Sequence, residues 1–125
     1  MAGPTVIPAL RYRDAPAAIA WLTGVFGFEE NLVVPGEGGR IEHAQLLWEG
    51  DVVMLGSFRD DDHDRGPTWT YLVTDDVDGH HDRAVAAGAD IVDPLVDMDY
   101  GGRGYTARDP EDNLWSVGSY RPEIG

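Results

Sequence analysis

The sequence has no cysteine, few basic residues and no long apolar run. Without cysteine there can be no disulfide, no thiolate nucleophile and no cysteine-ligated zinc site. The amino-terminal residues lack the basic and apolar regions of a signal peptide, and no stretch approaches the roughly 18 apolar residues of a membrane span. We therefore expect a soluble, cytoplasmic protein.

Basic residues are scarce: 9 stand against 23 acidic residues, for a formal net charge of -14. Such a charge repels phosphate backbones and anionic membrane surfaces, so neither nucleic acid nor a membrane is expected as a partner. Two interpretations of the acidity remain open at this point. It can support solubility alone, or it can attract a cationic ligand.

The 125 residues suffice for one domain, and they divide into two similar halves. The first half, residues 5–58, predicts a strand, a helix and three further strands. A polar connector at 59–67 leads to residues 68–120, which repeat the same order. Helix stripes are recognised by apolar spacings of three and four, and strands by alternation and by β-branched or aromatic residues.

The two halves are in register at an offset of 61 residues. This offset relates the expected helix caps Asp14 and Asp75, the helix-ending glycines Gly27 and Gly88, and the hairpin-turn residues Asp51 and Asp112. Identity beyond these points is low. The repeat therefore concerns architecture more than sequence.

The segment from Tyr100 to Tyr120 predicts the last hairpin, with its turn at Asp109-Pro110-Glu111-Asp112-Asn113. Proline presets the turn backbone, and Asp and Asn side chains hydrogen-bond to their own main chain in turns. Aromatic and aliphatic residues flank the turn on both sides, as in strands.

Two β-α-β-β-β halves, with FGF after the first helix, AAGA after the second and DPEDNLWS in the last hairpin, resemble the vicinal oxygen chelate superfamily. That group includes glyoxalase I, extradiol dioxygenases, fosfomycin-resistance enzymes and bleomycin-resistance-type drug-binding proteins. The resemblance implies an α+β fold in which two βαβββ modules form a curled mixed sheet around a cleft. It also implies a homodimer.

Enzymes of this superfamily hold a divalent metal with four side chains from the first and last strands of each module. The matching positions here are Ile7, Met54, Trp69 and Ser116, and their immediate neighbours include no histidine or carboxylate. First-row metals need imidazole or carboxylate ligands. We therefore predict no metal, no cofactor and no catalytic residue.

Eight residues are predicted to bind a small-molecule ligand: His43, Gln45, Met54, Trp69, Tyr100, Arg103, Tyr105 and Trp115. His43 and Gln45 share a strand face with Ile41 and Leu47 and could orient a ligand. The aromatic residues supply stacking area, and Tyr100-Gly101 matches a segment that borders the pocket in drug-binding members of the superfamily.

Each of these residues can instead have a purely structural role. His43 can make its hydrogen bonds within the core or an interface, and the aromatic residues can belong to the core. Arg103 can pair with one of the many acidic residues instead of a ligand carboxylate. His80 and His81 are expected on the second helix with one turned toward its apolar face, and as adjacent residues they cannot easily share an ion. The GEGG segment precedes no helix, so it does not predict a phosphate site.

These observations predict metal-independent binding of a small aromatic or cationic molecule, such as sequestration of an antibiotic. The alternative is a glyoxalase-like metal-dependent lyase, isomerase or dioxygenase. A third hypothesis is an accessory binding domain encoded in a biosynthetic gene cluster. The sequence does not distinguish this role from a role in antibiotic resistance.

Overall fold

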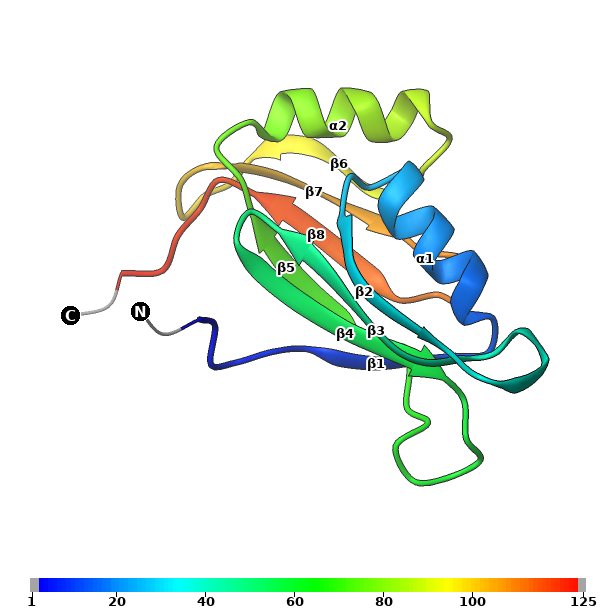
Figure 1. Cartoon of the computed structure of the whole chain (residues 1–125). Helices are drawn as coiled ribbons and strands as arrows, with labels where there is room; N and C mark the ends of the chain where they lie inside the picture. The colour runs from blue at the N-terminus through cyan, green and yellow to red at the C-terminus, as the bar shows by residue number, and fades with distance from the viewer. Residues whose placement is uncertain (1–2, 124–125) are drawn as a thin grey trace.

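The computed structural model describes residues 3–123 and has two β-α-β-β-β halves (Figure 1). The first consists of β1 (Ala9–Tyr12), α1 (Ala15–Gly24), β2 (Glu29–Pro35), the short 3-10 turn η1 (Glu37–Gly39), β3 (Ile41–Trp48) and β4 (Asp51–Ser57). The second consists of β5 (Trp69–Val73), α2 (Val77–Ala86), β6 (Asp90–Asp97), β7 (Arg103–Arg108) and β8 (Leu114–Gly118). This is the α+β fold that the sequence predicts.

Each half forms its own four-stranded mixed sheet. The strand orders are β1-β4-β3-β2 and β5-β8-β7-β6, so the two sheets have the same topology. In both, the first strand runs parallel to the last, and the remaining neighbours are antiparallel. Helix α1 packs on β1 and β4, whereas α2 packs on β6 and β7 (Figure 1). Neither helix within residues 3–123 is long and apolar enough to cross a lipid bilayer.

The helix boundaries follow local signals. Asp14 caps α1 by accepting the Ala17 N–H, as predicted, and Gly27 and Gly88 follow the two helices with φ of 86° and 91°. Glycine adopts this left-handed conformation without the steric cost that a Cβ would add. The predicted cap of the second helix was wrong by one residue: Asp76, not Asp75, caps α2 by accepting the Gly79 N–H. The offset between the halves is therefore not constant.

Two strands have distinctive features. Strand β1 is confined to Ala9–Tyr12, because Asp14 already caps α1. Strand β6 continues to Asp97, but its pairing with β7 is irregular between Ile91 and Val96, the stretch that contains Pro94. Proline has no N–H to donate to a ladder, and β6 is an edge strand.

One core joins the two halves, and the last hairpin turn is part of it. The buried Asp109 carboxylate accepts hydrogen bonds from the Tyr12 hydroxyl (2.7 Å), the Trp115 indole N–H (3.0 Å) and the Asn113 backbone N–H (3.1 Å). Glu111 in the same turn accepts the backbone N–H groups of residues 13 and 14. The predicted turn chemistry is confirmed, and the turn also fastens β1 to the second half.

Candidate functional site

Each sheet has a buried face and an open face. In the first sheet, Ala44, Leu46 and Trp48 of β3 are buried, and the alternating residues between them are only half-buried. In the second sheet, Tyr105, Trp115 and Val117 are buried, whereas Trp69 and Tyr71 are exposed. We call the half-buried and exposed sides of the two sheets the open faces.

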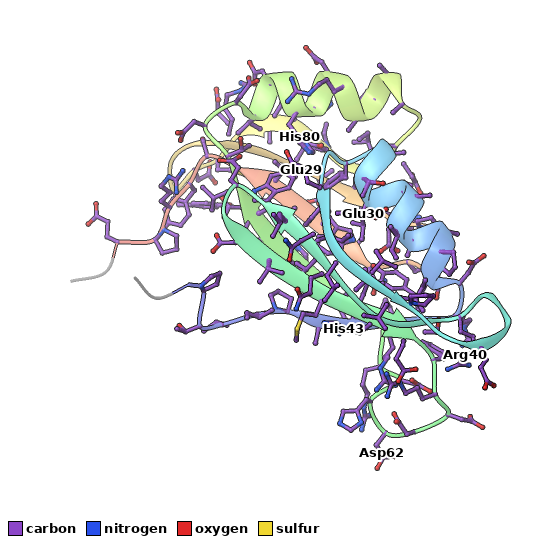
Figure 2. All side chains as sticks on the ribbon, in the orientation of Figure 1. Glu29, Glu30, Arg40, His43, Asp62 and His80 are labelled. Carbon is purple, nitrogen blue, oxygen red and sulfur yellow. The ribbon has the colours of Figure 1, made fainter. Side chains whose placement is uncertain are left out.

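The open face of the first sheet carries three of the predicted ligand-binding residues. Gln45 and Met54 are paired on neighbouring strands β3 and β4, and His43 lies two residues from Gln45 on the same face. Figure 2 shows the position of His43. A cavity of about 150 Å³ is lined by His43, Met54 and Arg59 together with residues of β1. The structure therefore brings together an imidazole, an amide and a polarisable thioether.

The open face of the second sheet is covered by aromatic rings. The Trp69 indole N–H donates a 2.8 Å hydrogen bond to the Ser116 hydroxyl, although the residue remains 73% exposed. Tyr71 lies across Gly118, since a Cβ at residue 118 would come within 2.6 Å of the Tyr71 hydroxyl. Two small residues on β8 thus leave space for two aromatic side chains from β5.

A further pair of aromatic residues continues this surface. The Tyr71 hydroxyl donates to the Tyr120 carbonyl at 2.7 Å, and the Tyr120 ring meets Tyr100 edge to face at 5.0 Å between ring centres. Partial burial raises the pKa of the Tyr71 hydroxyl, so it stays protonated and able to donate at neutral pH. We call Trp69, Tyr71, Tyr100 and Tyr120 the aromatic surface.

The donor groups at the open faces do not fit a divalent metal. Ile7 precedes β1, and Met54 offers only a soft thioether. The Ser116 hydroxyl already accepts from Trp69 and shares a 2.7 Å hydrogen bond with Thr106. Across the part of the chain that the structure describes, no three histidine, aspartate or glutamate side chains are grouped closely enough to hold a metal ion. No metal-dependent step can be derived from these residues.

Two predicted ligand-binding residues lie in the core. Trp115 is fully buried and donates to Asp109, and Tyr105 is 1% exposed with its hydroxyl 2.6 Å from Nδ1 of His80. Trp115 precedes Ser116 on β8, so the alternation of side chains sends it to the buried face. For both residues the structure supports the alternative interpretation, in which they are part of the hydrophobic core.

Arg103 is held by acids. Its guanidinium donates to Asp78 of α2 at 3.0 Å and to Asp97 of β6 at 2.9 Å. The hydrogen bond to Asp97, followed by that to Asp78, raises the pKa of Arg103. Arg103 therefore pairs with two carboxylates and lies on the side of the sheet that faces α2, away from Trp69.

The eight ligand-binding residues predicted from the sequence do not include Tyr71, Tyr120 or His80. Tyr71 is two residues from Trp69 on a strand, and this spacing places both residues on one face. For Tyr120 and His80 the sequence offers little signal, because their roles depend on partners far along the chain.

Comparison with known proteins agrees with this architecture. The sequence profile described as Glyoxalase/Bleomycin resistance protein/Dioxygenase superfamily matches residues 6–117. An uncharacterized protein of Mycobacterium bovis is 33% identical over 97% of this chain and 86% of its own length.

Solved structures of other proteins share this fold. TioX from Micromonospora sp. ML1 is 35% identical and superposes with a TM-score of 0.82, covering 95% of this chain and 100% of TioX. TnmS3, an antibiotic binding protein from Streptomyces sp. CB03234, shares the fold with a TM-score of 0.73 at 24% identity, covering 94% and 97% of the two chains. On its sequence and its fold, the chain belongs to the Glyoxalase/Bleomycin resistance protein/Dioxygenase superfamily.

Proposed function

We propose that this protein binds a small planar aromatic molecule, neutral or cationic, without a metal ion. The observation that carries the proposal is the position of Trp69 and Tyr71, whose rings lie over Ser116 and Gly118 on an open sheet face. Stacking on such rings contributes affinity and tolerates different ring systems. The net charge of -14 favours a cationic ligand through long-range attraction.

The neighbouring protein TnmS3, which is described as antibiotic binding, supports an antibiotic as the ligand class. Sequestration would need only binding, and binding requires none of the metal ligands that the open faces lack. The metal-dependent lyase, isomerase or dioxygenase alternative has no donor set in the described residues on which a mechanism could be built.

We further propose that two copies pair through their open faces. Exposed apolar residues lie on the open face of each sheet: Leu32 and Val34 on the first, Trp69, Tyr71 and Val96 on the second. Exposed apolar residues that gather on one face of a protein are typical of an interaction surface. Pairing the first sheet of one copy with the second sheet of the other would enclose a ligand between His43, Gln45 and Met54 of one copy and the aromatic surface of its partner.

The binding proposal can be tested by titrating the purified protein with doxorubicin, ethidium and bleomycin, followed by tryptophan fluorescence and equilibrium dialysis. At least one compound is expected to bind saturably at micromolar concentration. Trp69→Ala should weaken this binding about tenfold or more, equivalent to about 1.4 kcal/mol of lost stacking. The control Trp21→Phe changes a residue that stacks on Phe26 of the core and should leave affinity unchanged.

Binding in the presence of EDTA should equal binding in its absence. Three results would each contradict the proposal: no saturable binding, equal affinity of Trp69→Ala and the native protein, or loss of binding with the chelator. Elemental analysis showing one tightly held Ni, Zn, Fe or Mn per chain would instead favour the enzymatic alternative.

A mixing experiment tests the shared site. His43→Ala and Trp69→Ala variants, each impaired alone, are combined, unfolded and refolded together. If each site draws on two copies, random pairing restores about a quarter of the native sites. If each site lies within one chain, the mixture recovers no binding.

A further inference from the structure

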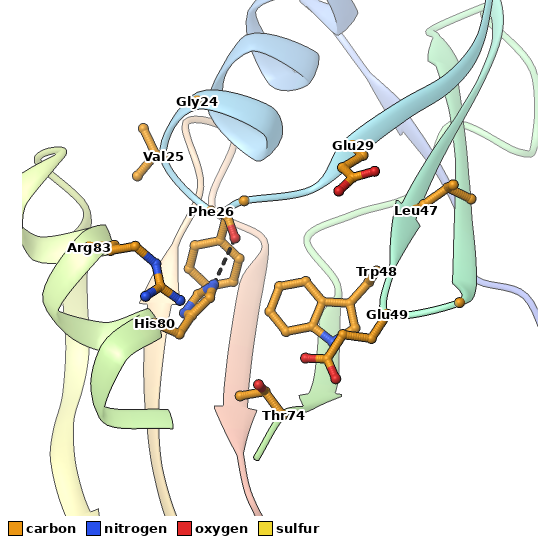
Figure 3. A pocket seen from close by; sticks show the side chains of 12 residues that line it. Gly24, Val25, Phe26, Glu29, Leu47, Trp48, Glu49, Thr74, His80 and Arg83 are labelled. Atoms are coloured by element: carbon orange, nitrogen blue, oxygen red, sulfur yellow. Dashed lines mark hydrogen bonds between the residues drawn. The ribbon is translucent and has the colours of Figure 1, made fainter. Parts of the chain in front are cut away.

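A second cavity lies at the junction of the two halves, apart from the aromatic surface. It has a volume of about 470 Å³ and is bounded by the end of α1, the β3–β4 turn and α2 (Figure 3). Small-molecule sites commonly have volumes of about 300–1,000 Å³ and form where two structural units meet. None of the eight residues predicted to bind ligand lines this cavity.

The floor of the cavity consists of packed rings and is uncharged. His80 lies 5.0 Å from the Trp48 ring and 4.7 Å from the Phe26 ring, measured between ring centres. Its Nε2 is 2.7 Å from the Phe26 carbonyl, drawn as a dashed line in Figure 3. A carbonyl can only accept, so Nε2 carries the proton, and the Tyr105 hydroxyl donates to Nδ1. Burial lowers the pKa of His80, which keeps the ring neutral.

Opposite charges face each other across this floor. Glu29 and Glu49 project from the first sheet and its turn, and Arg83 projects from α2 on the other side (Figure 3). Within residues 3–123, neither glutamate makes a hydrogen bond or an ion pair to a side chain, and Arg83 reaches only Asp76, at 3.7 Å. These charges are therefore available to a ligand.

We propose that this cavity binds a small zwitterion whose ammonium and carboxylate are at opposite ends, either an ω-amino acid or a dipeptide. The ammonium would lie between Glu29 and Glu49, and the carboxylate would meet the Arg83 guanidinium as a bidentate partner. The chain between the two ends would rest on the ring of Trp48. A simple anion would meet two carboxylates, and a simple amine would make no use of Arg83, which would keep only its ion pair with Asp76 at 3.7 Å.

The test uses 6-aminohexanoate, diglycine, hexylamine and N-acetyl-6-aminohexanoate, added to the ¹⁵N-labelled full-length protein. The Trp48 ring lines the cavity, and its indole N–H donates to the Val73 carbonyl at 2.9 Å, so its NMR resonance reports on the site. The indole resonance of Trp69 reports on the aromatic surface. Zwitterion binding is expected to shift the Trp48 signal saturably and to leave the Trp69 signal in place.

Hexylamine and N-acetyl-6-aminohexanoate, which each retain one charge, should bind at least about tenfold more weakly than 6-aminohexanoate. Arg83→Gln and Glu49→Gln should each weaken the zwitterion about fivefold to tenfold. Two controls should retain native affinity: Arg108→Gln, in a distant ion pair with Asp90, and Trp69→Ala. Retention of zwitterion binding in Trp69→Ala separates this site from the proposed aromatic site, so each proposal can fail without the other.

Comparison of the two zwitterions identifies the source of the ligand. Diglycine binding more tightly than 6-aminohexanoate indicates a peptide, and the reverse order indicates an ω-amino acid. The proposal is wrong if neither compound shifts the Trp48 resonance up to about 10 mM, a limit that corresponds to negligible affinity. It is also wrong if hexylamine binds as tightly as 6-aminohexanoate, or if Arg83→Gln leaves affinity unchanged.

Discussion

Each face of the second sheet carries a tryptophan, but one is buried and the other is exposed. On the buried face, Trp115 is fully enclosed and its indole N–H donates to the buried Asp109. On the open face, Trp69 also has its indole N–H bonded, to Ser116, yet most of its ring surface is exposed. A satisfied polar atom therefore does not distinguish a core tryptophan from a surface tryptophan; the exposure of the ring does.

The largest expected effect is the difference in the free energy of unfolding between alanine substitutions of these two tryptophans. Trp115→Ala should lower the free energy of unfolding by about 4 kcal/mol, because it removes a large buried ring and leaves a cavity. Trp69→Ala should cost less than about 1 kcal/mol, since its ring is largely in water already. Urea unfolding followed by far-ultraviolet circular dichroism measures both. Similar costs for the two substitutions would contradict the assignment of the faces.

Asp109 provides the next largest effect on the buried face. Asp109→Ala should lower the free energy of unfolding by about 3 kcal/mol, because several buried donors, Tyr12 and Trp115 among them, lose their acceptor. Tyr12→Phe, which removes only one of these donors, is the matched control and should cost about 1 kcal/mol. Urea midpoints measured under the same conditions give both values. Equal losses would mean that Asp109 acts through the Tyr12 contact alone.

On the open face, Gly118→Ala tests whether Tyr71 lies flat on β8. The added Cβ would meet the Tyr71 hydroxyl at 2.6 Å, Tyr71 Cε1 at 2.9 Å and the Arg103 carbonyl oxygen at 3.1 Å. We expect a loss of about 1–2 kcal/mol as the ring is displaced. In a Tyr71→Ala background the same substitution should cost clearly less, which a double-mutant cycle of thermal unfolding can measure. Additive costs would place the Tyr71 ring elsewhere.

The smallest expected effect concerns His80, which joins the buried side of α2 to the first half. Burial lowers the pKa of His80 below its ordinary 6.5, so the unfolded chain takes up a proton before the folded protein does. Its contribution to stability is therefore complete above about pH 6.5 and is lost as the pH falls below that value.

His80→Gln should remove this pH dependence, because a glutamine amide can still donate to the Phe26 carbonyl and accept from Tyr105. The native protein should lose up to about 1.4 kcal/mol more per pH unit than the variant in the acid range. Urea unfolding at a series of pH values measures the difference, with the exposed His63→Gln as the control. Parallel curves for native protein and His80→Gln would show that His80 does not titrate as proposed.

Much of the fold could be predicted because its signals are local. Asp14 and Gly27 act on residues within one helical turn of themselves, and the Asp109 carboxylate accepts N–H groups from within its own turn. The element order follows from such signals. Asp75 was predicted to cap α2 in place of Asp76 because the offset between the halves was taken as constant. The connection from the first strand to the helix is in fact one residue longer in the second half.

The candidate site could be predicted only in part. His43, Gln45 and Met54 do share one face, because residues two apart on a strand and residues paired across strands lie on the same side. Tyr105, Trp115 and Arg103 were predicted to bind ligand, whereas the structure gives each of them a partner inside the protein. Those partners are between 6 and 25 residues away in sequence.

By itself the sequence determined the order of strands and helices, the two repeated halves, the turn residues and the superfamily. Only the tertiary structure decided which aromatic residues are core and which are surface, and that Glu29, Glu49 and Arg83 line one cavity. The physical reason is that alternation along a strand divides residues into two sets without saying which set is buried. When both sets contain tryptophan and tyrosine, the packing of helices and of the other half makes that choice.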